Sequence, residues 1–103
     1  MSGELTLTLG QERIVLRPSF AALSALEQDA GTGLITLARR FAEGNFTLSD
    51  CVAIVRAGIL GAGGVVPPNL GELIVAGGLA ALSAPLSRFL RMALTGESDA
   101  GKE

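Results

Sequence analysis

The glycine-rich stretch at residues 58–64 is the first whose residue types could support chemistry, because such loops bind phosphate groups through backbone N–H groups. A phosphate-binding loop requires a lysine and then a serine or threonine after its last glycine, but Val65 and Val66 occupy these positions. Such loops also follow a strand, whereas this stretch follows a segment with helical spacing. We therefore interpret it as a helix end and a flexible loop, and we expect no nucleotide cofactor.

The chain contains one cysteine and no histidine, so the commonest general base and metal ligand are missing. Cys51 lies in an apolar stripe of helical period, which is typical of a core residue rather than a nucleophile. Glu27 and Asp29 fall on different sides of a predicted helix, and Ser49 stands in Leu-Ser-Asp, the reverse of the carrier-protein order. We expect no enzyme, and no catalytic, cofactor-binding or metal-binding residues.

Two helices joined by a glycine turn are predicted over residues 34–61, and this is also the frame of a helix-turn-helix DNA-binding motif. The second helix would read the major groove, but Arg56 is its single basic residue. Arg39 and Arg40 lie on the first helix, where a solvated face is the simpler interpretation. The formal charge of −2 also argues against a polyanionic partner. A DNA-binding regulator stays open as a second alternative.

The composition indicates one small folded domain with an excess of apolar residues. The 103 residues are 49% hydrophobic and 17% charged, with a mean hydropathy of +0.49. Two explanations stay open: some of this apolar surface meets a partner protein, or alanine and the 14 glycines inflate the value. The N-terminus lacks the basic and apolar regions of a secretory signal, and the uncharged runs are too short to span a membrane. We expect a cytosolic protein without a membrane-spanning segment.

Two β-strands are predicted within the first seventeen residues. Leucines alternate strictly with Glu4 and threonines over residues 4–9, a turn follows at 10–12, and residues 13–17 return with Ile14 and Leu16 on one face and Val15 on the other. The result is a β-hairpin that requires helices beneath its apolar face. Its outer edges keep free backbone groups, so we expect a candidate assembly edge there.

Helical spacing and capping residues predict four to five helices after Pro18. Ser19 is suited to begin the first helix, Thr32 the second, and Thr47 the third with Asp50 as its capping partner. The helices at residues 34–43 and 48–61 each carry one apolar stripe and are predicted to fold on each other. In the third helix, this stripe consists of Leu48, Cys51, Val52, Val55 and Ile59.

Asn69 is predicted to begin another helix, with Glu72 three residues later completing its cap, and Gly77–Gly78 should weaken or break this helix. The residues of this helix that we expect to face inward are Leu70, Leu73 and Ile74. A helix is expected again over residues 79–94, kinked at Pro85.

Together these patterns predict an α+β, mainly α fold with an N-terminal two-stranded β-hairpin, about residues 4–17, packed on a bundle of four to five helices. We expect a single domain over residues 1–95 and a disordered polar tail at 96–103.

The order of these segments resembles a family of small phage-like proteins encoded with tail genes in gene transfer agents and prophages. The matching features extend from about Gly3 to about Leu94. They are Gly-Glu-Leu-Thr-Leu-Thr-Leu at 3–9, Arg17-Pro18-Ser19-Phe20, Ala22-Leu23, Leu26-Glu27, Arg40-Phe41-Ala42-Glu43-Gly44, Ser49-Asp50, the glycine loop at 58–64, Gly78-Leu79 and Phe89-Leu90.

The resemblance implies a tail morphogenesis protein: a tail assembly chaperone that shields the apolar helical tape-measure protein, or alternatively a stoichiometric tail tube component. It implies a protein partner and a possible homo-oligomer in the bacterial cytoplasm or the particle tail, with no nucleic acid, membrane or small-molecule ligand. The glycine loop at 61–69 and the last helix are the expected contact surface, and an aspartate at position 86 or 89 should abolish binding. The partner-binding residues expected on that helix are Leu79, Leu82, Leu86, Phe89, Leu90, Arg88 and Arg91.

Overall fold

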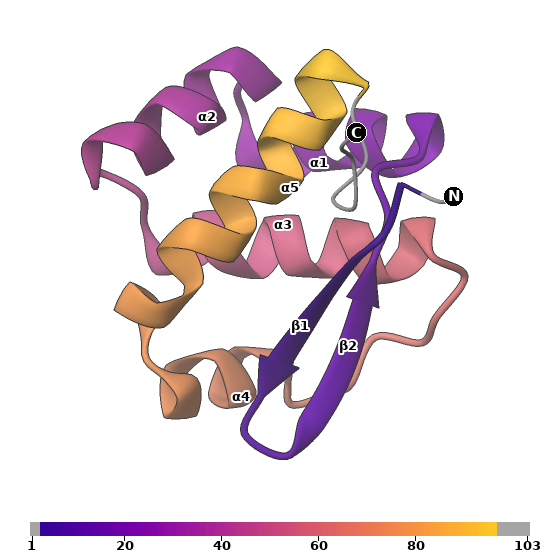
Figure 1. Cartoon of the computed structure of the whole chain (residues 1–103), viewed down its shortest axis with the longest axis vertical. Helices are drawn as coiled ribbons and strands as arrows, with labels where there is room; N and C mark the ends of the chain where they lie inside the picture. Colours follow the sequence, from indigo (N-terminus) through magenta and orange to yellow (C-terminus); the bar gives the residue numbers. More distant parts are fainter. Residues whose placement is uncertain (1–2, 97–103) are drawn as a thin grey trace.

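The computed structural model describes residues 3–96, so the predicted tail lies outside the described residues from residue 97 onward. The described chain begins with a two-stranded hairpin and continues with five α-helices and one short 3-10 helix (Figure 1). This confirms the predicted α+β, mainly α fold. In chain order the elements are β1 (Leu5–Leu9), β2 (Glu12–Leu16), α1 (Phe20–Ala30), α2 (Leu34–Glu43), α3 (Leu48–Gly61), α4 (Leu70–Gly77), η1 (Leu79–Leu82) and α5 (Ser83–Thr95).

The hairpin has the predicted alternation and a two-residue turn. β1 and β2 are antiparallel, with Leu7 opposite Ile14, and Gly10 and Gln11 connect them. Gly10 has a φ of 62°, which side-chain-bearing residues rarely adopt, so this tight turn depends on glycine. The leucines of β1, together with Ile14 and Leu16, face the helices and are buried, while the alternate residues are exposed.

Helix α3 is the element around which the others pack, since it contacts β2, α1, α4 and α5. In Figure 1 it runs across the molecule behind the hairpin and α5. The prediction that the helices at 34–43 and 48–61 fold on each other is wrong. Helix α2 packs mainly on α5, and α3 packs mainly on α1 and β2, because the apolar stripes of the two helices face different partners.

The end of α3 passes very close to β2 and to the residue after it. A Cβ on Gly58 would lie 2.7 Å from the Cβ of Leu16, and a Cβ on Gly61 would overlap the carbonyl oxygen of Arg17. The Arg17 N–H donates to the Gly58 carbonyl oxygen at 2.9 Å. The first glycines of the glycine-rich stretch therefore allow a helix to pack tightly on a strand, and the stretch does end a helix as predicted.

Some helix starts differ from their predicted caps. Ser19 caps α1 as expected, because its hydroxyl oxygen accepts from the N–H of the first turn. Thr32 does not cap α2; Gly33 holds that position and offers no side chain. Instead, the Leu34 N–H donates to a carboxylate oxygen of Glu27 at 3.0 Å, so a side chain from α1 satisfies the start of α2.

Helix α4 begins after Asn69, but the predicted cap is wrong because no side chain there bonds the first turn. Asn69 has φ −105° and ψ 31°, outside the extended conformation that a capping side chain requires. The predicted break after α4 is confirmed at Gly78, whose φ of 86° turns the chain. No single described helix is long and apolar enough to cross a membrane. Helix α4 and the segment Leu79–Thr95 pass that test only together, and they are bent by 97°.

Pro85 does not kink a helix as predicted. The expected helix at 79–94 is divided into η1 and α5, and Pro85 is the third residue of α5. Its missing N–H falls in the first turn, where backbone N–H groups have no partner within the helix. The proline is therefore compatible with a regular α5.

Candidate protein-binding surface

The side chains expected to bind a partner on the last helix mostly form the core of the chain itself. Leu82, Leu86, Phe89 and Leu90 are buried, so the folded chain does not present them on its surface. Leu79 and Arg88 are half-buried, and Arg91 is exposed. The apolar face of α5 packs against α2, η1, β1 and α3, which is why these residues repeat with helical period. A surface that a partner can reach must therefore consist of other, exposed residues.

Several large apolar side chains are exposed at the surface and do not belong to the buried core. Two of them, Leu48 on α3 and Val75 on α4, line one open pocket of about 440 Å³ together with Gly71, Glu72 and Ala76; we call it the α3–α4 pocket. Leu48 is 41% exposed and Val75 58%. Among residues 3–96, the exposed large apolar side chains are Val15, Phe20, Ile35, Leu48, Leu60, Val65, Val75 and Leu94.

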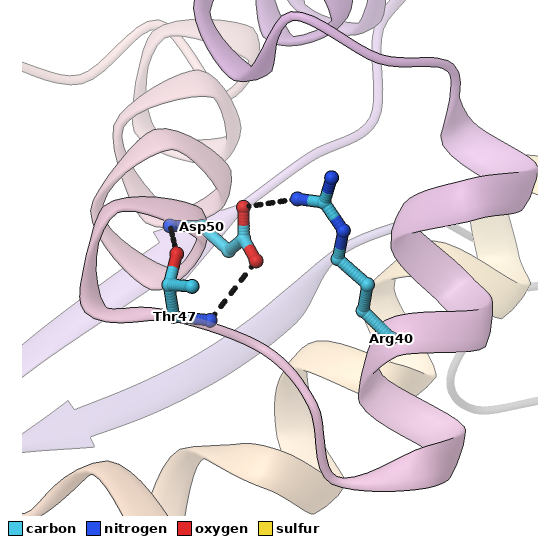
Figure 2. A network of polar contacts seen from close by, with 3 residues as sticks. All are labelled: Arg40, Thr47 and Asp50. Atoms are coloured by element: carbon cyan, nitrogen blue, oxygen red, sulfur yellow. Dashed lines mark hydrogen bonds and ion pairs between the residues drawn. The ribbon is translucent and has the colours of Figure 1, made fainter.

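A polar network at the start of α3 fixes the position of Leu48 (Figure 2). The Thr47 hydroxyl accepts from the Asp50 N–H at 3.0 Å, and the Asp50 carboxylate accepts from the Thr47 N–H at 2.9 Å. This confirms the predicted capping pair, and it satisfies two of the free donors at the helix start. Leu48 follows Thr47 directly, so the cap holds the first residue of the helix at the rim of the pocket.

Arg40 extends this network from α2 to α3. Its guanidinium donates to the second carboxylate oxygen of Asp50 at 2.9 Å (Figure 2). Asp50 is the one buried charged side chain among the described residues, and it is compensated both by the ion pair and by the cap. Arg40 thus joins two helices, while Arg39 is exposed as expected. A paired role for Arg40 was not predicted, because ten residues separate the partners and no helical spacing relates them.

Helix α4 forms one wall of the pocket, and two of its side chains anchor it in the core. Leu70 and Ile74 are buried, whereas Gly71 and Val75, which follow them directly and lie about 100° further round this short helix, line the pocket. A Cβ on Gly71 would meet no atom within 4 Å, so the backbone of α4 is open to the pocket at this point. An apolar side chain from a partner would therefore contact both the helix backbone and Val75.

A second open pocket of about 380 Å³ adjoins the first, since Leu48 lines both. Its other walls come from α1 and α3, with Val52 and Ala53 as apolar residues. Asp29 and Arg56 form its charged rim, where the Arg56 guanidinium and the Asp29 carboxylate are 3.9 Å apart. The two pockets form a surface with apolar walls and charges of both signs at one end.

The exposure of Leu48 corrects the predicted stripe of α3, in which this residue faced inward. Cys51, Val55 and Ile59 are buried and Val52 is half-buried, but Leu48 lies one turn before the part of α3 that other elements cover. Val75 was outside every predicted inward face, so its sequence position was consistent with exposure. Val65, in the predicted contact loop, is 89% exposed.

Chemical reactivity is low at the cysteine. Cys51 has an exposed fraction of 0%, and burial, helped by the nearby charge of Asp50, raises the pKa of its thiol from 9.0 to about 11. No group of three or more histidine, cysteine, aspartate or glutamate side chains within residues 3–96 is arranged to hold a metal ion. Cys51 is therefore a core residue, as its place in the apolar stripe predicted.

We expect the stability of the protein to fall at alkaline pH because of Cys51. The folded state holds the thiol proton more tightly than the unfolded state, so the resulting stabilisation is complete below pH 9 and is lost as the pH rises toward 11. The free energy of unfolding can be measured by urea unfolding at about pH 8 and about pH 10.5. We expect the Cys51 thiol to lower it by about 2 kcal/mol at the higher pH. The variant Cys51→Ala should lack this component. An equal alkaline loss in both proteins would contradict the prediction.

Comparison with known proteins gives the family of the chain. No curated protein and no solved structure matches the chain significantly. The family model described as phage tail tube protein, GTA-gp10, matches residues 2–96, which is nearly the whole chain and includes the hairpin and all five helices. The chain therefore belongs to the phage tail tube protein, GTA-gp10, family, and its role lies in the structure or assembly of a phage-type tail.

Proposed function

We propose that the protein is a tail assembly chaperone that shields apolar helical segments of the tape-measure protein until the tail tube encloses them. The observation that carries the proposal is the α3–α4 pocket, where Leu48 and Val75 stay exposed beside a closed core. Exposed apolar side chains that gather around one concave surface mark a place where another protein binds. The role requires no catalytic residue.

A helix is the occupant that this surface suits best. The pocket is open and mainly apolar, and an amphipathic helix binds such a surface by laying its apolar face along it. Leu48 and Val75 come from two different helices, so a ligand helix would contact both walls at once. The rim charges of Glu72, Asp29 and Arg56 stay in water, where they favour orientation more than affinity.

The alternative is a stoichiometric tail tube component, which the name of the family favours. The two roles differ in what remains after assembly, because a chaperone leaves before the tail is complete. Quantitative mass spectrometry of purified particles distinguishes them. A chaperone should be present at far less than one copy per tail ring, whereas one copy or more per ring would favour the tube component.

Charged substitutions in the α3–α4 pocket should weaken binding to the tape-measure protein. Burial of one large apolar side chain contributes about 1.5–3 kcal/mol, so Leu48→Asp and Val75→Asp should each raise the Kd about tenfold to a hundredfold. Both side chains are exposed, so the variants should fold, as circular dichroism would check. Binding would be measured with a soluble helical fragment of the tape-measure protein.

Leu60→Asp is the matched control for this experiment. Leu60 lies on the same helix as Leu48 and has a similar exposed fraction, 52% against 41%, but it does not line the pocket. We expect its Kd to equal that of the unchanged protein within about twofold. Equal weakening by all three substitutions would indicate a nonspecific apolar effect, and unchanged binding by folded Leu48→Asp and Val75→Asp would refute the proposed site.

A further inference from the structure

A second groove runs along β2, the strand of the hairpin that is followed by α1. Residues 12–15 of β2 form one wall, and Ile59, Val65 and Pro67 from the end of α3 and the loop after it contribute to the other. The groove has a volume of about 320 Å³. In Figure 1 this loop passes behind β2 on its way to α4. None of these residues lines the α3–α4 pocket.

Backbone groups of β2 point into this groove. The Arg17 N–H points away from β1, because it donates to the Gly58 carbonyl oxygen on α3. The N–H and C=O groups of successive residues in a strand point to opposite edges. Those of Arg13 and Val15 therefore point to the same edge as the N–H of Arg17, away from β1. Within residues 3–96 the sheet consists of two strands, and no other described group pairs with these atoms of Arg13 and Val15. They form a free edge bordered by a groove.

The side chains along this edge define the chemistry of what could pair with it. Arg13, Val15 and Arg17 lie on the exposed face of the hairpin, on alternate residues. Neither arginine forms an ion pair with another described residue. Opposite charges and β-branched pairs stabilise neighbouring strands. Backbone pairing is open at Arg13 and Val15 and ends at Arg17, whose N–H is bonded to Gly58. The edge therefore suits a strand with a β-branched residue opposite Val15 and acidic residues beside the two arginine side chains, while Val65 offers apolar contact across the groove.

We propose that an extended segment of a partner protein binds here by adding a third strand to the hairpin, with acidic and β-branched residues alternating along it. A second copy of β2 fits less well. If two copies paired antiparallel with Val15 at the symmetry axis, Arg13 of each would face Arg17 of the other, which is unfavourable. β1 already packs against α4 and α5 within its own chain. Addition of a strand to β2 goes beyond the proposed chaperone role and uses a separate surface.

A fluorescent peptide with the sequence acetyl-Ser-Glu-Val-Thr-Val-Glu-Ser-amide tests the proposal by anisotropy. Val15→Pro removes one outward N–H, and a free strand edge tolerates proline. We expect this variant to bind at least about tenfold more weakly than the unchanged protein. Val15→Thr keeps the N–H and the β-branched shape, so its Kd should change by less than about twofold. Equal binding by folded Val15→Pro would overturn the proposal, as would no binding by the unchanged protein at about 1 mM peptide.

Arg13→Glu gives a readout that does not depend on how proline is tolerated. This variant should bind the acidic peptide at least about fivefold more weakly and should lose the preference for it over a peptide in which lysine replaces both glutamates, because the unchanged Arg17 still favours the acidic peptide. An unchanged preference would overturn the proposed charge pairing. Size exclusion with light scattering of the protein alone supplies another outcome. A dimer that Val15→Pro dissociates would overturn the proposal in favour of a second copy as occupant.

Discussion

Replacing Gly61 with alanine should lower the free energy of unfolding by about 3 kcal/mol or more, which is near the upper end for overpacking. An added Cβ would overlap the carbonyl oxygen of Arg17 and would also lie 3.0 Å from the Cβ of Ala22. The first of these atoms belongs to the backbone between β2 and α1, so it cannot move without displacing both elements. Thermal unfolding should show a loss of roughly 12 °C or more in Tm.

Gly71→Ala is the matched control, since Gly71 also lies in a helix but has open space where its Cβ would be. Alanine is favoured over glycine in helices by up to about 1 kcal/mol, so this variant should be equally stable or more stable. Opposite signs for the two glycine-to-alanine substitutions would confirm the close approach of the end of α3 to the backbone between β2 and α1. A Gly61→Ala variant as stable as the unchanged protein would contradict this packing.

Leu86→Asp should prevent the protein from folding. Leu86 has an exposed fraction of 0%, so the substitution removes about 2–5 kcal/mol of apolar packing and also buries an unpaired carboxylate. The sum approaches the whole stability of a small domain, about 5–15 kcal/mol. Circular dichroism should show no cooperative thermal transition, and a folded variant with an ordinary Tm would contradict the placement of α5 in the core.

Arg91→Glu is the corresponding control on the same helix. Arg91 is exposed, so its substitution should change the free energy of unfolding by less than about 0.5 kcal/mol. The comparison also changes how a binding experiment at position 86 is interpreted. Loss of partner binding by Leu86→Asp would report loss of the fold, whereas the exposed Leu48 and Val75 report on the surface itself.

The elements of the fold were largely predictable because their signals are local. Strict alternation in β1 leaves its leucines on one face, and this holds whatever covers that face. The cap of α3 was equally clear, since Thr47 and Asp50 are three residues apart and bond each other's backbone. The helix break at Gly77–Gly78 follows from the same kind of information.

Features that depend on how elements cross were not predictable. The partner of Arg40 comes from another helix, and only the path of the turn between α2 and α3 places Asp50 within 2.9 Å of it. Leu48 carries the helical period of a core residue, but the described elements cover the first turn of α3 only in part, so this side chain stays 41% exposed. The roles of Gly58 and Gly61 likewise depend on β2, which is distant in sequence and adjacent in space.

The same reason explains why the expected binding residues on the last helix proved to be core. An apolar stripe of helical period shows that a face is covered, but it does not distinguish the chain's own core from a partner. In this fold α2 covers α5, so Leu86, Phe89 and Leu90 are enclosed. Exposure, which only the packed structure provides, identifies Leu48 and Val75 as residues that a partner can reach.

The most direct test of the proposed function is to co-express the protein with the tape-measure protein of the same tail and to examine the soluble fraction by size exclusion with light scattering. We expect the long chain to stay soluble and to elute with this protein, and we expect the double variant Leu48→Asp, Val75→Asp to lose that effect while Leu60→Asp keeps it. Precipitation of the long chain in every case, with rings or polymers formed by this protein alone, would contradict a chaperone and favour a tail tube component.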